Sequence, residues 1–162
     1  MSTARWHVAR WPALAWIETG LKLGAFAAAG VAIVAGRGMR EPTVWTAPAI
    51  ARIAILGTLA GGLTAAIADR WRDRELVSIG FVLLNNAAHW GVVAVLLSSP
   101  TTASPWFAVF LGLMLAGDLA KVVFLRVHRF TTRGASPAVM LGLTSAYVLG
   151  YAAVLLLEVI PR

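Results

Sequence analysis

Five apolar stretches, each long enough to cross a lipid bilayer as a helix, account for most of this chain. A spanning α-helix needs about 20 consecutive, predominantly apolar residues. The candidate spans run over residues 12–35, 48–68, 76–97, 106–125 and 137–160. Because the segments between them are short, no soluble domain remains. We therefore expect an all-α integral membrane protein in which residues 1–162 form one domain, a bundle of five transmembrane helices.

The overall composition points to the same class of protein. Hydrophobic residues make up 59% of the chain and charged residues only 13%, whereas soluble domains are about 45–50% apolar and about 25% charged. The net charge of +7 does not indicate nucleic-acid binding, because the basic residues stand at the ends of the apolar runs rather than on one polar face. The absence of cysteine excludes disulfides, thiolate nucleophiles and iron–sulfur clusters.

Proline and serine mark the positions where helices are expected to begin. Ser136 followed by Pro137 is the arrangement of an N-cap with proline at the first helical position. Pro12 and Pro48 suit helix starts in the same way. The first apolar run is longer than the roughly 7–15 residues of a signal-peptide core, and further spans follow it. We therefore expect it to be retained as the first helix.

The distribution of arginine predicts the orientation of the bundle. Short cytoplasmic loops carry an excess of Lys and Arg. With the N-terminus inside, the cytoplasmic side has eight arginines: Arg5, Arg10, Arg70, Arg72, Arg74, Arg126, Arg129 and Arg133. The opposite side has four: Arg37, Arg40, Arg52 and Arg162. We therefore expect a cytoplasmic N-terminus and an outside C-terminus, in the plasma membrane of a prokaryotic cell.

Several tryptophans lie near the predicted ends of the spans. They are Trp6, Trp11, Trp45, Trp71 and Trp106. Tryptophan is enriched at both membrane–water interfaces, where its amphipathic ring sits at the level of the lipid headgroups. We interpret these residues as an aromatic belt rather than as a binding cage.

Two pairs of glycines have the spacing that lets membrane helices approach closely. Gly20 and Gly24 stand four residues apart in the first span, as do Gly57 and Gly61 in the second. We favour the interpretation that both pairs pack helices within one bundle. The alternative is a contact between two copies of the chain, which would make the protein a homo-oligomer with membrane lipid around it.

Polar side chains occur at similar depth in four of the five spans. An ionisable residue at the centre of a span costs roughly 2.5–3.5 kcal/mol on insertion scales, so each one is a hypothesis of function. The residues are Glu18, Lys22, Asn85, Asn86, His89, Asp118, Lys121, Tyr147 and Tyr151. The second span is expected to contribute only hydroxyls, from Thr58 and Thr64, and Glu158 is expected at the outer interface.

The spacing of these residues groups them on helix faces. Asn85 and Asn86 precede His89 by four and three residues, so the three share a face. Tyr147 and Tyr151 also share one. Glu18 with Lys22, and Asp118 with Lys121, have the spacing of local ion pairs. The structural alternatives are ion pairs near the headgroups, amides that join helices, and tyrosines that pack with a tethered hydroxyl.

Acid–base chemistry suits this polar layer better than metal or haem chemistry. The other histidines, His7 and His128, lie at span ends, so no bis-histidine haem site forms, and one histidine with scattered carboxylates makes a weak zinc site. No P-loop or nucleophile elbow is present. Histidine titrates near neutral pH, and a desolvated carboxylate can hold a proton there. We therefore predict His89 and Asp118 as the proton-handling pair, with no metal and no cofactor.

The remaining polar residues are assigned supporting roles. We expect Asn85 and Asn86 to orient His89 or the ligand, and Tyr147 and Tyr151 to line the pocket. Lys22 and Lys121 are expected to act as counter-charges, with Glu18 beside them in the ligand-binding set. A molecule that reaches the middle of a bilayer must be lipophilic.

Three functions remain open at this point. The first is binding of a lipophilic small molecule, with isomerisation, cyclisation or hydration by proton transfer. The second is a carrier or channel for protons or a small solute. The third is an accessory subunit of a larger membrane complex, in which the polar layer only holds helices together.

Overall fold

The computed structural model describes residues 11–36, 45–73, 76–98, 104–128 and 136–159, and this part of the chain is almost entirely helical. The helices are α1 (Ala13–Gly36), α2 (Ala47–Asp73), α3 (Leu76–Ser98), α4 (Pro105–His128) and α5 (Pro137–Val159). Each is long and apolar enough to cross a bilayer. A helix satisfies its backbone hydrogen bonds within the segment, as lipid requires. The expected five spanning-length helices are therefore confirmed, and they indicate an integral membrane protein.

The helices follow the predicted spans. The predicted second span over residues 48–68 is confirmed, since Ala47–Ala68 is long and apolar enough to cross a membrane, and α2 continues beyond it to Asp73. Residues 69–73 contain no glycine or proline, so nothing in them stops the helix where the apolar span ends. The predicted start at Ser136 is confirmed, since the Ser136 hydroxyl accepts a hydrogen bond from the Val139 N–H at 3.3 Å.

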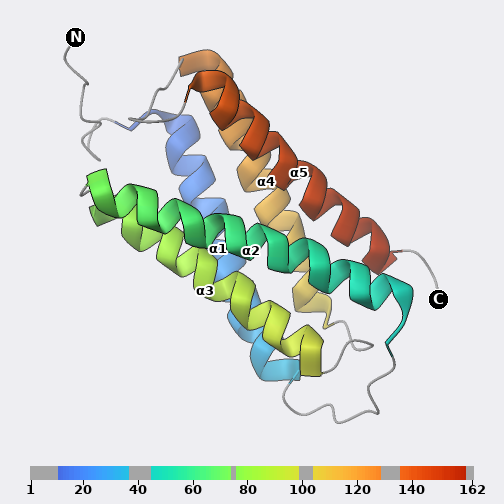
Figure 1. Cartoon of the computed structure of the whole chain (residues 1–162). Helices are drawn as coiled ribbons and strands as arrows, with labels where there is room; N and C mark the ends of the chain where they lie inside the picture. Colours follow the sequence, from blue (N-terminus) through green and yellow to red (C-terminus); the bar gives the residue numbers. More distant parts are fainter. Residues whose placement is uncertain (1–10, 37–44, 74–75, 99–103, 129–135, 160–162) are drawn as a thin grey trace.

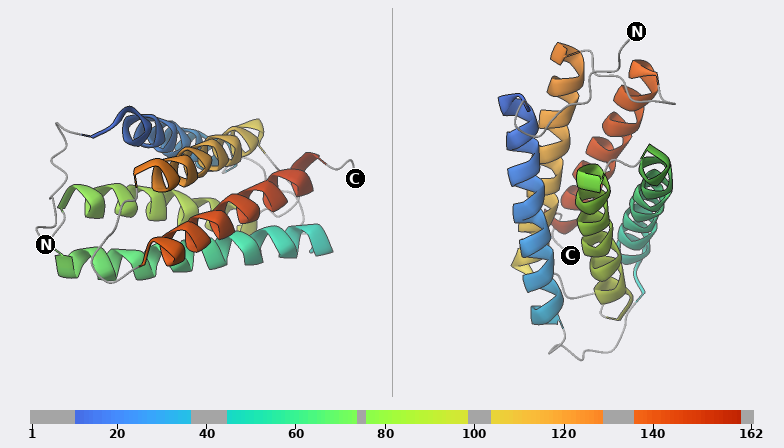
Figure 2. Two further views of the ribbon diagram at one scale, coloured as in Figure 1. Left: turned by 90° about the horizontal axis from the view of Figure 1, so that it is seen from above. Right: turned by 90° about the vertical axis from the view of Figure 1, so that its left-hand side faces the viewer.

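The five helices form a closed ring in which each packs mainly against two neighbours. Around the ring the order is α1, α3, α2, α5 and α4, and α4 packs back against α1. Figures 1 and 2 show α1 beside α4 on one side of the bundle and α2 beside α3 on the other, with α5 between α4 and α2. Two sequential hairpins, α2–α3 and α4–α5, are thus joined through α1.

The centre of the ring is filled by side chains from every helix. Small residues let α1 approach its neighbours: Ala25, Ala28, Ala29 and Ala32 are all buried. Leu56 of α2, Phe110 of α4 and Val154 of α5 are fully buried beside them. The polar residues at the centre are therefore held in a packed apolar core.

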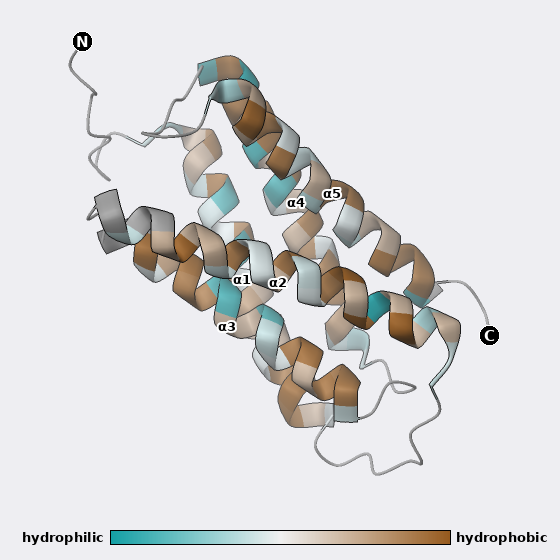
Figure 3. Ribbon diagram, viewed as in Figure 1, coloured by the Kyte–Doolittle hydropathy of each residue, from teal (hydrophilic) through white to brown (hydrophobic). Residues whose placement is uncertain are grey.

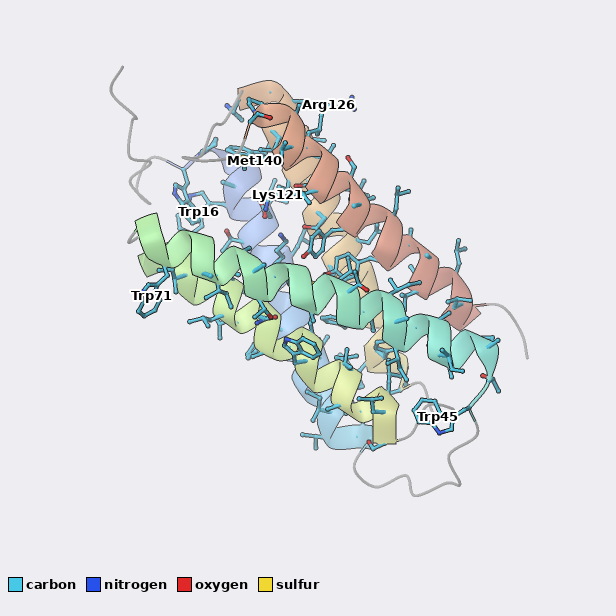
Figure 4. All side chains as sticks on the ribbon, in the orientation of Figure 1. Trp16, Trp45, Trp71, Lys121, Arg126 and Met140 are labelled. Carbon is cyan, nitrogen blue, oxygen red and sulfur yellow. The ribbon has the colours of Figure 1, made fainter. Side chains whose placement is uncertain are left out.

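The outside of the bundle has the apolar surface that a lipid-facing protein needs. Large hydrophobic side chains stand outward on every helix, with Leu149 of α5 69% exposed, and Figure 3 shows hydrophobic residues along all five helices. In Figure 4, Trp16 and Trp71 lie at the end of the bundle that carries Arg126, and Trp45 lies at the opposite end. Exposed Trp45, Trp71 and Trp106 fit the predicted aromatic belt, and Trp6 lies outside the described residues.

The glycine pairs do not pack as predicted. Only Gly24 meets a neighbouring helix, with a Leu113 methyl of α4 3.5 Å from the position that its Cβ would take. Nothing lies within 4 Å of the corresponding positions at Gly20, Gly57 and Gly61. The interpretation that Gly57 and Gly61 pack helices within the bundle is therefore wrong, because α2 turns this face outward. A contact between two copies there stays a prediction.

Candidate functional site

A charged cluster joins α1 to α4. The Lys22 ammonium lies 2.8 Å from Glu18 Oε1 and 2.9 Å from Asp118 Oδ1. Lys121 reaches the same Glu18 oxygen at 3.9 Å. The sequence predicted two separate local pairs, whereas the structure makes Lys22 the shared partner of carboxylates on two helices. Two lysines and two carboxylates give this group a formal charge of zero, which lowers the cost of holding it among apolar helices.

Gly117 leaves the space in which the Lys22 side chain reaches Asp118. A Cβ added at Gly117 would lie 3.1 Å from Lys22 Cγ, so any larger residue would press on the lysine stem. On its other side, the Lys22 ammonium lies 5.8 Å from the ring centre of Phe81 on α3, a cation–π distance. The glycine that directly precedes Asp118 was the sequence signal for this close approach.

The charged cluster becomes more buried toward the centre of the bundle. The Lys121 side chain is 34% exposed and that of Glu18 14% exposed. The Lys22 side chain falls to 8% and that of Asp118 to 6%. Figure 4 places Lys121 on the same half of the bundle as Arg126. Any exchange of protons or ions with the surroundings is therefore most direct from this end.

A second polar group occupies the centre of the ring around His89 of α3. The ring is fully buried. Its Nδ1 lies 2.8 Å from the Asn85 carbonyl oxygen, and its Nε2 is hydrogen-bonded to the Tyr151 hydroxyl of α5. Phe110 of α4 packs against it edge-on, with the ring centres 5.4 Å apart. His89 is thus held by three helices.

These contacts assign the tautomer of His89. A carbonyl oxygen only accepts hydrogen bonds, so Nδ1 carries the hydrogen that it donates to Asn85. In the neutral ring, Nε2 then accepts the hydroxyl hydrogen of Tyr151. His89 and Tyr151 therefore form a neutral pair in the apolar centre, in which Tyr151 is the donor and Nε2 of His89 the acceptor.

His89 and Asp118 belong to two neighbouring groups rather than to one bonded pair. Asp118 is bound to Lys22, while His89 is bound to Asn85 and Tyr151. On α4, Phe110 touches His89 and stands eight residues before Asp118, about 12 Å along the helix axis. The joint catalytic role of His89 and Asp118 stays a prediction.

The two asparagines point to different neighbours. Asn85 does orient His89, but through its backbone oxygen, while its side-chain amide donates to the Phe81 carbonyl at 2.9 Å. The Asn86 amide donates across to the Thr64 hydroxyl of α2 at 2.9 Å, where the Trp90 indole also donates at 3.2 Å. Asn86 therefore joins α2 to α3, the structural role that was the alternative for these amides.

Tyr147 lies one turn before Tyr151 on α5 and binds a different helix. Its hydroxyl donates to the Leu59 carbonyl of α2 at 2.8 Å. The two tyrosine rings are 6.2 Å apart, and Tyr147 is only half-buried whereas Tyr151 is fully buried. The predicted pair therefore stands on one face, with Tyr147 between Tyr151 and the outside of the bundle.

A buried ion pair between α2 and α5 was missed from the sequence. Arg52 Nε lies 3.0 Å from Glu158 Oε1, and Arg52 Nη2 donates to the Leu157 carbonyl at 2.7 Å. Arg52 is only 2% exposed. The expectation that the second span contributes only hydroxyls is therefore wrong. The available sequence signal was Arg52, near the start of the span over residues 48–68. Because the second and fifth helices run in opposite directions, Arg52 comes to the same end of the bundle as Glu158, near the end of the last span.

A small apolar cavity, about the size of one water molecule, lies between α1, α3 and α4. Its lining includes Ile33, Val95 and Phe107 and none of the polar residues described above. Within the described ranges, no group of three or more histidine and carboxylate side chains is arranged to hold a metal ion.

No protein family, no curated protein and no solved structure matches the chain.

Proposed function

We propose that this small polytopic membrane protein binds a lipophilic small molecule at the His89–Tyr151 pair and exchanges a proton with it. The observation that carries the proposal is the neutral, hydrogen-bonded His–Tyr pair at the centre of an apolar ring, apart from the charged cluster. A neutral pair can meet an uncharged molecule without the desolvation cost of a bare ion.

The proton balance of such a reaction closes within the pair. Tyr151 passes its hydroxyl proton to Nε2 of His89 while its oxygen takes a proton from one carbon of the bound molecule. His89 is then an imidazolium, and the electron pair of the broken C–H bond stays on the molecule, delocalised over a neighbouring double bond. Reversal of both transfers at a second carbon returns the pair to its starting state and leaves the double bond moved. Isomerisation of this kind needs no oxidant or cofactor, and Tyr151 carries a proton before and after each transfer.

The charged cluster supports the pair from one side. Lys22 and Asp118 hold α1 and α4 at a fixed separation, and Phe110 of α4 in turn packs on His89. Asp118 is a positioning residue in this scheme, and Lys121 and Glu18 connect the cluster to the more exposed end.

The test is mass spectrometry of small molecules that co-purify with the wild type and with His89→Phe and Tyr151→Phe. Thr58→Val is the matched control, because the Thr58 hydroxyl is bonded only to the carbonyl of Ala54 on its own helix and is exposed. We expect a lipophilic compound with the wild type and the control that is lost from both folded site variants. Equal retention in all four proteins, or no compound in any, would overturn the proposal.

One observation favours carriage of a proton or small solute as a second candidate. Charged groups lie toward both ends of the central column, with Lys121, Glu18, Lys22 and Asp118 toward one and Arg52 with Glu158 toward the other. The neutral His89–Tyr151 pair lies between them. A proton flux into liposomes that is present in the wild type and lost in Asp118→Asn would favour this function. A protein partner that co-purifies equally with every variant would instead favour an accessory subunit.

A further inference from the structure

The interface between α2 and α5 combines polar links with apolar packing. Three polar links cross it: Arg52 to Glu158, Arg52 to the Leu157 carbonyl, and Tyr147 to the Leu59 carbonyl. Between the two ends, Leu59 and Ile55 pack over Gly150, as Ile33 of α1 packs over Gly91 of α3. We call this α2–α5 interface the seam.

The seam ends part of the way along both helices. Its contacts run from Arg52 and Glu158 at one end to Gly62 and Tyr147 at the other, where a side chain at Gly62 would collide with the Tyr147 hydroxyl. Beyond this point α2 follows α3, through the bond between Thr64 and Asn86. The two helices separate toward the end that carries Lys121, as Figures 1 and 4 show.

The N-terminal half of α5 packs against α4, with α1 beside them. Met140 belongs to a small cluster with Phe124 and Leu125 of α4, against which Leu14 of α1 packs. On this side of the seam, Tyr147 is bonded to Leu59 of α2 and is half-buried.

The polar links at the two ends of the seam differ in whether breaking them leaves a carbonyl group without a hydrogen-bond partner. Leu59 lies in the middle of α2, so its carbonyl accepts a helical hydrogen bond whether or not Tyr147 is present. Leu157 lies in the last turn of α5, where carbonyls have no partner within the helix, so Arg52 satisfies a group that would otherwise be unpaired. The Tyr147 end is therefore the easier one to open, and the Arg52 end is the hinge.

Behind Tyr147 lies the candidate site. The Tyr147 ring is 6.2 Å from that of Tyr151, whose hydroxyl binds His89. A side-chain rotation of Tyr147 away from Leu59 would break the polar link that lies beside Tyr151. Apolar side chains also line the seam, with Leu59 and Ile55 packed against Gly150.

We propose that the α2–α5 seam is the route by which an uncharged lipophilic molecule with one hydroxyl or carbonyl group enters from the bilayer. Tyr147 is its gate, and the entering polar group takes over the hydrogen bond that the Tyr147 hydroxyl gives up. The Arg52–Glu158 pair is the hinge. The inference rests on the proposed function and explains how a fully buried His89–Tyr151 pair can be reached from the bilayer.

The chain offers a sharp test because it has no cysteine. A Cβ at Gly150 would lie 3.5 Å from Ile55 Cγ2, so Ile55→Cys with Gly150→Cys can form a disulfide that locks the seam. The matched control is Ile33→Cys with Gly91→Cys across α1 and α3, where the corresponding distance to Ile33 Cγ1 is 3.6 Å. The probe is a long-chain alcohol with a diazirine group, in phosphatidylcholine liposomes, and the labelled residues are located by mass spectrometry.

We expect photolabelling of Tyr151 and His89 to fall at least tenfold when the α2–α5 pair is oxidised and to return on reduction. The α1–α3 lock should leave it unchanged, and Tyr147→Phe should raise it severalfold. Labelling that neither lock changes, that only the control lock abolishes, or that never reaches these residues would overturn the route.

The same preparations separate this inference from the function on which it rests. A co-purifying compound that depends on His89 but is still exchanged when the seam is locked refutes the route and leaves the function standing. If no compound depends on His89 in any preparation, the proposed function itself fails, and the route fails with it because no ligand uses it.

Discussion

The Tyr151 hydroxyl binds Nε2 of His89 across the centre of the ring, between residues 62 positions apart in the chain. Both side chains are fully buried. Tyr151→Phe leaves Nε2 as a buried acceptor without a partner, which costs about 1–3 kcal/mol. We expect the free energy of unfolding, measured in detergent micelles, to fall by this amount. In a His89→Phe background the same change should cost much less, and equal costs in both backgrounds would show that the bond contributes nothing.

Tyr147→Phe provides a contrast with Tyr151→Phe. The Leu59 carbonyl keeps its helical hydrogen bond when the Tyr147 hydroxyl is removed. We expect a loss of about 0.6 kcal/mol, the average for a side-chain hydrogen bond between membrane helices. The same unfolding experiment measures it. A loss as large as that of Tyr151→Phe would contradict the description of Tyr147 as an easily opened gate.

Lys22 should matter far more for stability than Lys121. Removal of Lys22 leaves Glu18 and Asp118 buried without their shared partner, and a broken buried pair costs about 3–5 kcal/mol. Lys121 is 34% exposed and 3.9 Å from Glu18, so its removal should cost about 0–1 kcal/mol. Thermal aggregation of Lys22→Ala and Lys121→Ala in the same detergent ranks the two, and similar midpoints would contradict the shared-partner geometry.

The Arg52–Glu158 pair predicts a rescue experiment. Arg52→Glu alone places two carboxylates together in a buried position and should prevent folding. With Glu158→Arg added, opposite charges face each other again, and we expect folded protein to return in part. The Leu157 carbonyl loses its guanidinium partner in the double variant, so rescue should be incomplete. The yield of monodisperse protein on gel filtration is the readout, and no difference between single and double variants would contradict a direct pair.

Gly57 and Gly61 face outward, so larger residues there should not disturb the bundle. Nothing lies within 4 Å of the position that a Cβ atom would take at either residue. We expect Gly57→Leu with Gly61→Leu to keep the unfolding midpoint of the wild type and to abolish self-association, as measured by light scattering in detergent. Gly91→Leu is the control, because it would collide with Ile33 and destabilise the bundle itself. Self-association that survives in the double variant would remove this face as a dimer contact.

Much of the fold could be predicted from the sequence because the rules involved are local. The length and apolarity of each span and the requirement that lipid places on the backbone predict five helices, and all five are present. The Ser136 cap was equally local. The helix α2 continues past the predicted span into residues 69–73, because a helix can extend into polar residues once it has left the apolar layer.

The order of the helices around the ring decides which partners the polar side chains meet. The spacing of residues along one helix carries no information about that order. A spacing of three or four residues put Asn85, Asn86 and His89 on one face, yet Asn86 turned to α2 and His89 to α5. Lys22 bound Asp118 because Gly117 let α4 approach α1. The residues that must avoid lipid can be read from the sequence, since that cost belongs to each side chain. The side chains that they meet follow from the packing of the five helices, because they depend on which helix lies opposite.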